Sequence, residues 1–134
     1  MDGSMFFGNV PAETLVDAAE KILAKIGDAD IAASYEREIS RMPGEAFAAL
    51  IESIFAAFRE RGESSEDAAE EAGTTLEQIE QRHDGAADAL LQYARSSPYL
   101  LQEATMLFIE QRPELISALP AAVRDPLAAY VAVP

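Results

Sequence analysis

The sequence predicts an all-α fold, a compact bundle of about six to eight helices, several of them short, with no β-sheet. Two observations lead to this prediction. Nearly every apolar residue falls on the 3.6-residue period of a helix, and no stretch alternates between apolar and polar residues over the length of a strand. Proline, glycine, serine and threonine separate the periodic stretches at positions where helices begin and end. We therefore expect more than about 60 % of the chain to be helical.

Proline and glycine delimit the first two predicted helices. The first begins at Pro11, because proline suits the first turn of a helix, and it ends at Gly27. The second begins at one of the two aspartates within residues 28–30 and ends at the Pro43-Gly44 pair. Proline and glycine at these places interrupt the apolar period, so each helix has a defined beginning and end.

The third predicted helix has the broadest apolar face in the chain and ends at Gly62. A broad apolar face indicates a helix that packs on several neighbours at once, so this helix is expected to form the centre of the core. The apolar residues that we expect to be buried on the first three helices are Leu15, Val16, Ala19, Ile22, Leu23, Ile26, Ile31, Tyr35, Ile39, Met42, Phe47, Leu50, Ile51, Ile54, Phe55 and Phe58.

The middle of the chain predicts two short helices. Ser64, with an acid three residues later at Asp67, is a helix-opening serine, and the helix that follows ends at Gly73. Thr74 and Glu77 then form a capping box, which opens the second short helix. The first of these helices offers little but alanine for burial.

Further helices are predicted in the remaining third. One runs over residues 85–95, and Ser97-Pro98 is expected to cap the next. Pro113 and Pro120 each open a short helical stretch. The apolar residues available for burial here are Ala89, Leu90, Tyr93, Ala94, Leu100, Leu101, Ala104, Leu107, Phe108, Leu115, Ile116, Leu119, Val123, Leu127 and Tyr130.

Two further expectations concern the last helix and the core. Pro126 is expected to break or restart the last helix, because proline removes a hydrogen bond and clashes with the preceding turn. The widest apolar faces should meet in one core. Its predicted central residues are Leu50, Ile54, Phe55, Phe58, Leu90 and Leu107.

The length of 134 residues fits one domain, so residues 1–134 are interpreted as a single helical domain. Residues 1–10 are expected to be a leader or a flexible N-terminus, with Met1–Ser4 as the leader-like part. The chain has no cysteine, and it shows neither a signal peptide nor a long apolar span. These features favour the cytoplasm.

The chain is strongly acidic, with 24 acids against 10 bases and a formal net charge of −14. Nucleic acids and anionic membranes are bound by lysine and arginine, so this charge opposes both as partners. A basic protein partner would suit it. The charge is uneven: residues 63–88 contain nine acids and one base, Arg82, whereas residues 95–134 contain four acids and three bases. The chain is thus expected to present two different surfaces.

Within residues 59–91, Arg61-Gly62 is followed by Glu66-Asp67-Ala68-Ala69-Glu70-Glu71-Ala72-Gly73 and then by Thr74-Thr75-Leu76-Glu77-Gln78-Ile79. This order resembles the helix-turn-helix of the tetracycline-repressor family, in which a threonine- or serine-capped recognition helix follows an Ala-Gly corner. The resemblance implies a DNA-binding regulator. However, acids occupy the recognition helix, where such regulators carry small, basic and aromatic residues. We expect any DNA-binding use to be lost or turned to protein contact.

The spacing of Glu80 and His83 places both on one helix face, as in the carboxylate bundles that bind two iron ions. Glu77 and Asp84 add oxygens nearby. A complete site of that kind needs a second such pair, and His83 is the only histidine. We therefore expect no metal and no cofactor. The sequence also offers no catalytic cysteine and no Gly-x-Ser-x-Gly elbow, so we do not expect an enzyme.

The functional expectation is a non-enzymatic helical protein that binds another protein, as an accessory or adaptor. Two alternatives stay open: a transcription regulator with a degenerate helix-turn-helix, and a ferritin-like carboxylate and histidine metal-binding protein. A homodimer is also expected, because the C-terminal third is nearly neutral and carries more apolar residues than its short helices can easily bury. The expected interface residues are Leu101, Phe108, Leu115, Leu127 and Tyr130.

Overall fold

The computed structural model describes residues 11–83 and 85–132, and over this part of the chain it contains helices and no strand. The predicted all-α class is confirmed, and the helical content of 79 % exceeds the minimum that the sequence pattern predicts. The expected leader or flexible N-terminus, residues 1–10, lies outside the described residues.

The described residues form eight α-helices and two 3₁₀ helices, several of them short, as expected. In chain order they are α2 (Ala12–Leu23), α3 (Asp28–Glu38), η1 (Ile39–Arg41), α4 (Gly44–Glu60), α5 (Ser65–Ala72), α6 (Leu76–Glu80), α7 (Ala86–Arg95), α8 (Leu100–Gln111), η2 (Pro113–Ala118) and α9 (Ala121–Ala132).

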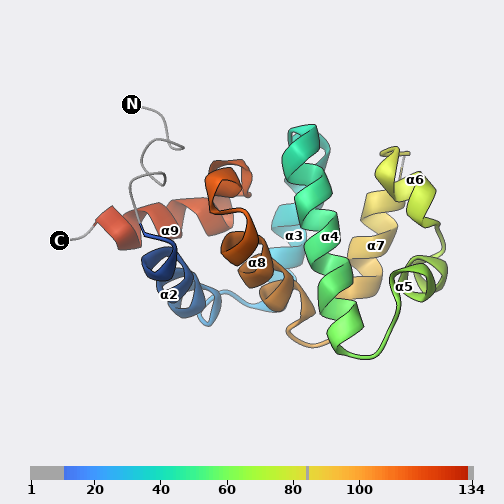
Figure 1. The fold of residues 1–134 in the computed structure, drawn as a ribbon, viewed down its shortest axis with the longest axis horizontal. Helices are drawn as coiled ribbons and strands as arrows, with labels where there is room; N and C mark the ends of the chain where they lie inside the picture. The colour runs from blue at the N-terminus through green and yellow to red at the C-terminus, as the bar shows by residue number, and fades with distance from the viewer. Residues whose placement is uncertain (1–10, 84, 133–134) are drawn as a thin grey trace.

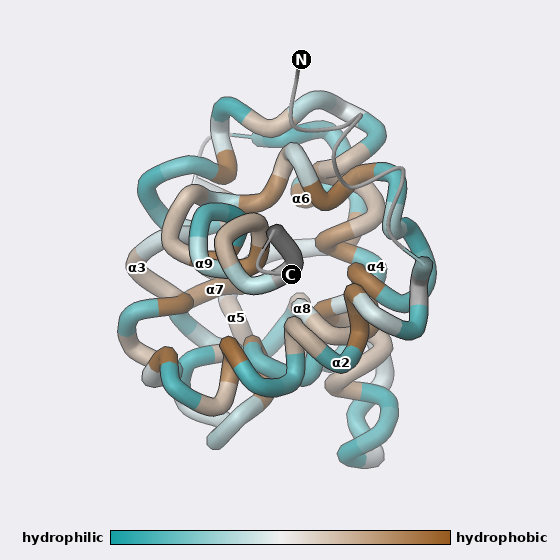
Figure 2. Tube along the Cα trace, turned by 90° about the vertical axis from the view of Figure 1, so that its left-hand side faces the viewer, coloured by the Kyte–Doolittle hydropathy of each residue, from teal (hydrophilic) through white to brown (hydrophobic). Residues whose placement is uncertain are grey.

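The helices are arranged around a central pair, α4 and α8, which pack against each other (Figure 1). At one end α2 packs on α8 and α9, and at the other α5 and α6 pack on α7. α3 contacts α7, α8 and α9, so it joins the two ends. Viewed from the α2–α9 end, hydrophilic stretches occupy much of the periphery (Figure 2).

Of the six residues predicted at the centre of the core, five are buried. All six apolar residues expected on α4 are buried, and so is Leu90 on α7. Leu107 is only half-buried, so its assignment to the core centre is wrong. It shares its face of α8 with Glu103 and Glu110, at the boundary between the buried and the solvent-facing sides.

The first helix ends earlier than the sequence predicts, at Leu23 instead of Gly27. The backbone N–H groups of Lys25 and Ile26 bond three residues back, which tightens the last turn. The side-chain amide of Gln102 on α8 donates to the carbonyls of Leu23 and Ile26 at 3.0 and 2.9 Å. The Gln102 side chain thus donates to carbonyls at the end of α2 and in the turn after it that would accept backbone N–H groups if the helix continued.

Pro126 does not break the last helix, contrary to expectation. α9 runs unbroken from Ala121 to Ala132 with Pro126 inside it. Proline leaves one helical carbonyl without its usual N–H partner, but Val123 and Leu127 on the same helix are buried. Packing of α9 against α2 and α3 outweighs the local cost of the proline.

Tyr93 on α7 ties the segment after α4 to the core. Its ring stacks on Phe58, with the ring centroids 5.2 Å apart, and its hydroxyl donates to the Glu63 carboxylate at 2.7 Å. This hydrogen bond, then burial, then the charges of Glu63 and Glu71 raise the pKa of Tyr93 to about 12. The neutral tyrosine is therefore favoured by folding.

Because the pKa is raised, the stability that Tyr93 contributes is fully present below its unfolded pKa of about 10 and is lost as the pH rises through about 12. Tyr93→Phe should therefore show a shallower loss of stability than the wild type between these pH values, measured by chemical denaturation. Burial also raises the pKa of Tyr35, so some alkaline loss should persist in the variant. Identical pH profiles for the two proteins would contradict this assignment.

Candidate functional site

The predicted helical corner is present in the middle of the chain. Gly62 and Gly73 both adopt left-handed backbone angles, with φ of 85° and 90°, which end α4 and α5. The Ser64 hydroxyl accepts from the backbone N–H of Asp67 at 3.1 Å, as the sequence predicts. The cap of α6 lies one residue later than expected.

Thr75, and not Thr74, is that cap, since its hydroxyl accepts from the backbone N–H of Gln78 at 3.1 Å. The predicted box of Thr74 with Glu77 is therefore wrong. The Thr74 hydroxyl instead donates to the side-chain oxygen of Gln78 at 3.0 Å. Two adjacent threonines carry the same local signal, and their position relative to the Gly73 turn decides which one caps.

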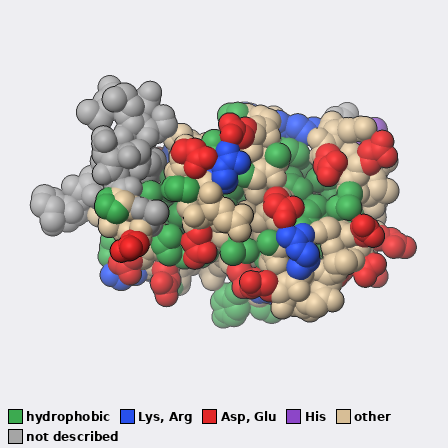
Figure 3. Space-filling view, viewed as in Figure 1, with side chains coloured by type: hydrophobic (Ala, Val, Ile, Leu, Met, Phe, Trp, Pro, Cys, Tyr) green, Lys and Arg blue, Asp and Glu red, His purple; other side chains and the backbone are tan. Residues whose placement is uncertain are grey.

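An apolar groove lies between α4 and the α5–α6 corner. Its cavity volume is about 380 Å³, and its floor on α4 is the stripe of Phe47, Ile51 and Phe55, each one helical turn from the next. Leu76 at the start of α6 forms the opposite wall. The face shown in Figure 3 has apolar side chains exposed over this region. The stripe spans about 12 Å at the helical rise of about 1.5 Å per residue.

Arg82 holds one end of this groove. It has a left-handed backbone, with φ of 56°, and its guanidinium carbon lies 4.3 Å from the centre of the Phe47 ring. The guanidinium also donates to three backbone carbonyls. The nitrogen-to-oxygen distances are 2.9 Å to Ile39, 3.1 Å to Ser40 and 2.8 Å to Met42. The side chain of the one base in residues 63–88 is therefore occupied by internal contacts. The sequence identifies Arg82 as the only base in this segment, but it does not indicate which groups the side chain contacts.

The corner beside the groove is acidic, although Arg82 lines the groove and Arg59 donates to the Ser65 hydroxyl at its edge, at 2.8 Å. Seven acids on α5, α6 and α7 are exposed, and among the described residues none of them is in an ion pair. Acidic side chains crowd this side of the molecule in Figure 3. The seven are Glu66, Asp67, Glu70, Glu71, Glu77, Glu80 and Asp88. We call the groove together with these acids the acidic groove.

The candidate metal ligands are not brought together. Glu77, Glu80 and His83 are all exposed, and within residues 11–83 and 85–132 no three potential ligands gather closely enough to hold an ion. The Glu77 carboxylate accepts instead from the side-chain amide of Gln81, at 3.3 Å. Asp84, the fourth candidate, lies outside the described residues.

Three of the five predicted interface residues belong to the core, so their assignment is wrong. Leu101, Phe108 and Leu127 are at most 1 % exposed within one chain. Helix α8 lies between α2 and α4, and α9 packs on α2, so these helices bury the three side chains within one chain. Leu115 is half-buried, and Tyr130 is 41 % exposed.

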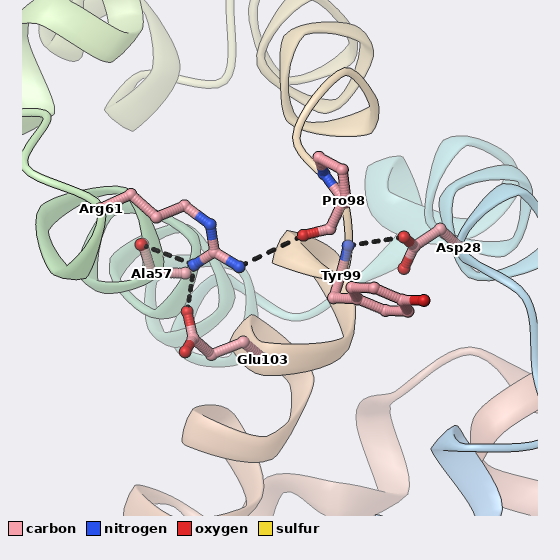
Figure 4. Close-up of polar contacts among 6 residues, drawn as sticks. All are labelled: Asp28, Ala57, Arg61, Pro98, Tyr99 and Glu103. Atoms are coloured by element: carbon pink, nitrogen blue, oxygen red, sulfur yellow. Dashed lines mark hydrogen bonds and ion pairs between the residues drawn. The ribbon is translucent and has the colours of Figure 1, made fainter.

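A second feature, which the sequence does not reveal, is the corner between α7 and α8. Ser97-Pro98 does not cap α8; the residue before the helix is Tyr99, with a left-handed φ of 63° and a side chain that is 66 % exposed. Its backbone N–H donates to the Asp28 carboxylate at 2.6 Å (Figure 4). Arg61 donates to the carbonyl of Pro98 at 3.3 Å.

Comparison of the chain with family models, with curated proteins and with solved structures found no match. The resemblance to the tetracycline-repressor helix-turn-helix is therefore limited to the local sequence pattern and to two short helices that meet at a tight corner. No helix in the described part of the chain is long and apolar enough to cross a membrane.

Proposed function

We propose that this chain is a non-enzymatic protein that binds another protein, and that the acidic groove receives the apolar face of a basic segment of that partner. One observation carries the proposal: an apolar floor of Phe47, Ile51 and Phe55 lies at the acidic corner formed by α5, α6 and α7. The seven exposed acids of this corner are in no ion pair among the described residues, and one of them, Glu80, lines the groove itself. Apolar grooves beside uncompensated charge suit recognition by contact and charge complementarity. A chain free of cysteine fits the cytoplasm, which we propose as its compartment.

The partner segment is expected to be an amphipathic helix. The floor is a single stripe on α4 about 12 Å long, which matches about two turns of a helix laid along it. Leucine-like side chains at helical spacing would fill the groove, and lysine or arginine on the flanks would face the acids of α5 and α6. Those acids have no ion-pair partners in the described chain, so their contact with a partner's bases breaks no ion pair; Glu52, which also lines the groove, stays paired with Arg59.

The same acids argue against the regulator alternative. Glu77 and Glu80 are exposed on α6, the helix that would have to approach phosphates. The metal-binding alternative lacks a three-ligand cluster among the described residues. Protein binding is the function that uses both the groove and the charge.

A designed peptide tests the proposal. The probe is a labelled helix of about 15 residues with leucine on one face and lysine on the other, compared with a scrambled peptide of the same composition. Fluorescence anisotropy should show tighter binding of the amphipathic peptide, with affinity falling as salt rises. Ala48→Gln, which fills the groove from an exposed position, should weaken binding roughly tenfold, or about 1.4 kcal/mol.

The matched control is Ala129→Gln, at an alanine on α9 that is also exposed, which should leave affinity unchanged. Equal binding of the scrambled peptide, or no effect of Ala48→Gln, would show that charge alone attracts the probe and would contradict a groove site. A labelled DNA duplex serves as a third probe, and we expect no binding at physiological salt. Specific, salt-sensitive DNA binding would support the regulator alternative instead.

A further inference from the structure

Tyr99 has a backbone conformation that suits glycine or asparagine and disfavours an aromatic residue. Its φ of 63° lies in the left-handed region, where an L side chain crowds the following carbonyl. Burial of the ring does not compensate for this cost, because the side chain is 66 % exposed, the most exposed large hydrophobic residue in the described chain. Folding therefore gains little from a tyrosine here.

Contacts from two other helices hold this conformation. Asp28, at the start of α3, accepts from the Tyr99 N–H, and Arg61, after α4, donates to the Pro98 carbonyl and to the Ala57 carbonyl. Arg61 is also paired with Glu103. Figure 4 shows the Tyr99 ring pointing away from Arg61. The second oxygen of Asp28 is buried without a hydrogen-bond partner among the described residues, a further cost at the same corner.

A hollow of about 320 Å³ lies directly beside the tyrosine, between α2 and α8, and Tyr99 itself forms part of its wall. Leu23, Ala24 and Met106 supply its apolar lining. A projecting aromatic ring next to an apolar hollow is a self-complementary arrangement. A two-fold axis between them would place the ring of each copy in the hollow of the other.

The charge of this face also suits a second copy of the chain. The only two lysines, Lys21 and Lys25, lie on α2 and in the turn after it, and Lys21 is paired with Asp17. The Arg61 charge is offset by Glu103. The charged residues that line the hollow are Glu20, Glu103 and Arg61, which leave it with one net negative charge, whereas the acidic groove, with seven acids outside ion pairs, would repel a second chain of charge −14 more strongly.

We propose that Tyr99 is the anchor of an interface between two copies of this chain, with each ring in the partner's hollow formed by Leu23, Ala24 and Met106. The strained residue is retained for binding, where exposed aromatic anchors contribute most. This interface is separate from the acidic groove, and it replaces the C-terminal surface that the sequence predicts.

Sedimentation equilibrium of the full chain tests the proposal, together with thermal unfolding at concentrations below the dissociation constant. The wild type should form a dimer at micromolar concentration. Tyr99→Asn and Tyr99→Gly should raise the dissociation constant at least roughly tenfold and yet raise the unfolding midpoint of the monomer, because both residues tolerate a positive φ. Tyr99→Phe should keep the dimer.

Salt distinguishes this interface from the acidic groove. Screening the repulsion between two −14 chains should strengthen dimerisation as salt rises, the opposite of the effect on a basic peptide. Tyr130→Ala, at the other exposed tyrosine, is the matched control and should leave the dimer intact. A monomer of about 14.5 kDa at both low and high salt would overturn the proposal, as would a dimer indifferent to Tyr99→Asn. A Tyr99→Asn chain with a lower unfolding midpoint would show that the tyrosine serves the fold.

Discussion

Phe108→Glu is expected to unfold the chain. Phe108 is 0 % exposed on α8, which packs on both α2 and α4. A carboxylate at this position would be buried without a partner, at a cost of at least several kcal/mol. Domains of this size are stable by only about 5–15 kcal/mol, so the loss removes most or all of the folded population. Circular dichroism should show the helical signal lost.

The control is Tyr130→Glu, at a position 41 % exposed on α9, where the new carboxylate stays in water near Lys21. Its helicity should be unchanged and its stability within about 0.5 kcal/mol of the wild type. A folded, monomeric Phe108→Glu chain would instead place Phe108 at an interface, as the sequence alone predicts.

Ile54→Ala should lower the free energy of unfolding by about 2–5 kcal/mol. Ile54 lies at the centre of the α4 face and is 0 % exposed, so the substitution leaves a cavity that its packed neighbours can only partly fill. Chemical denaturation measures the difference. The matched control is Glu60→Ala, an exposed residue at the end of the same helix, which should change stability by less than about 0.5 kcal/mol. A loss that small for Ile54→Ala would mean that the α4 face is not the core.

The sequence predicts those parts of the fold that local chemistry decides. Apolar residues at helical spacing on α4 mark a buried face whatever packs on it, and the cap at Ser64 needs only the residues beside it. Pro126 marks the limit of such rules, because packing of α9 on distant helices overrides the local preference of proline. Whether an apolar residue is buried or exposed likewise depends on the helices that pack around it. Phe108 has the apolar character of an interface residue, but α2 and α4 cover it.

The candidate site is less predictable for the same reason. The sequence indicates an acidic corner at residues 63–88, which is present, but the groove beside it depends on how α4 and α6 are spaced. Arg82 sets part of that spacing through carbonyls about 40 positions earlier in the chain. The conformation of Tyr99 depends on Asp28, 71 positions away. No local pattern encodes either contact.

The hydrogen bonds of Arg82 to the backbone carbonyls before α4 affect the dynamics of the acidic groove. α6 has only five residues and one buried side chain, Ile79, so it cannot persist as an isolated helix. Its place beside α4 depends on that side chain and on the carbonyl contacts of Arg82. Such an element opens locally at a lower free energy than the whole chain unfolds. The amide hydrogens of α6 should therefore exchange with solvent through this opening, and a peptide bound in the groove should slow their exchange.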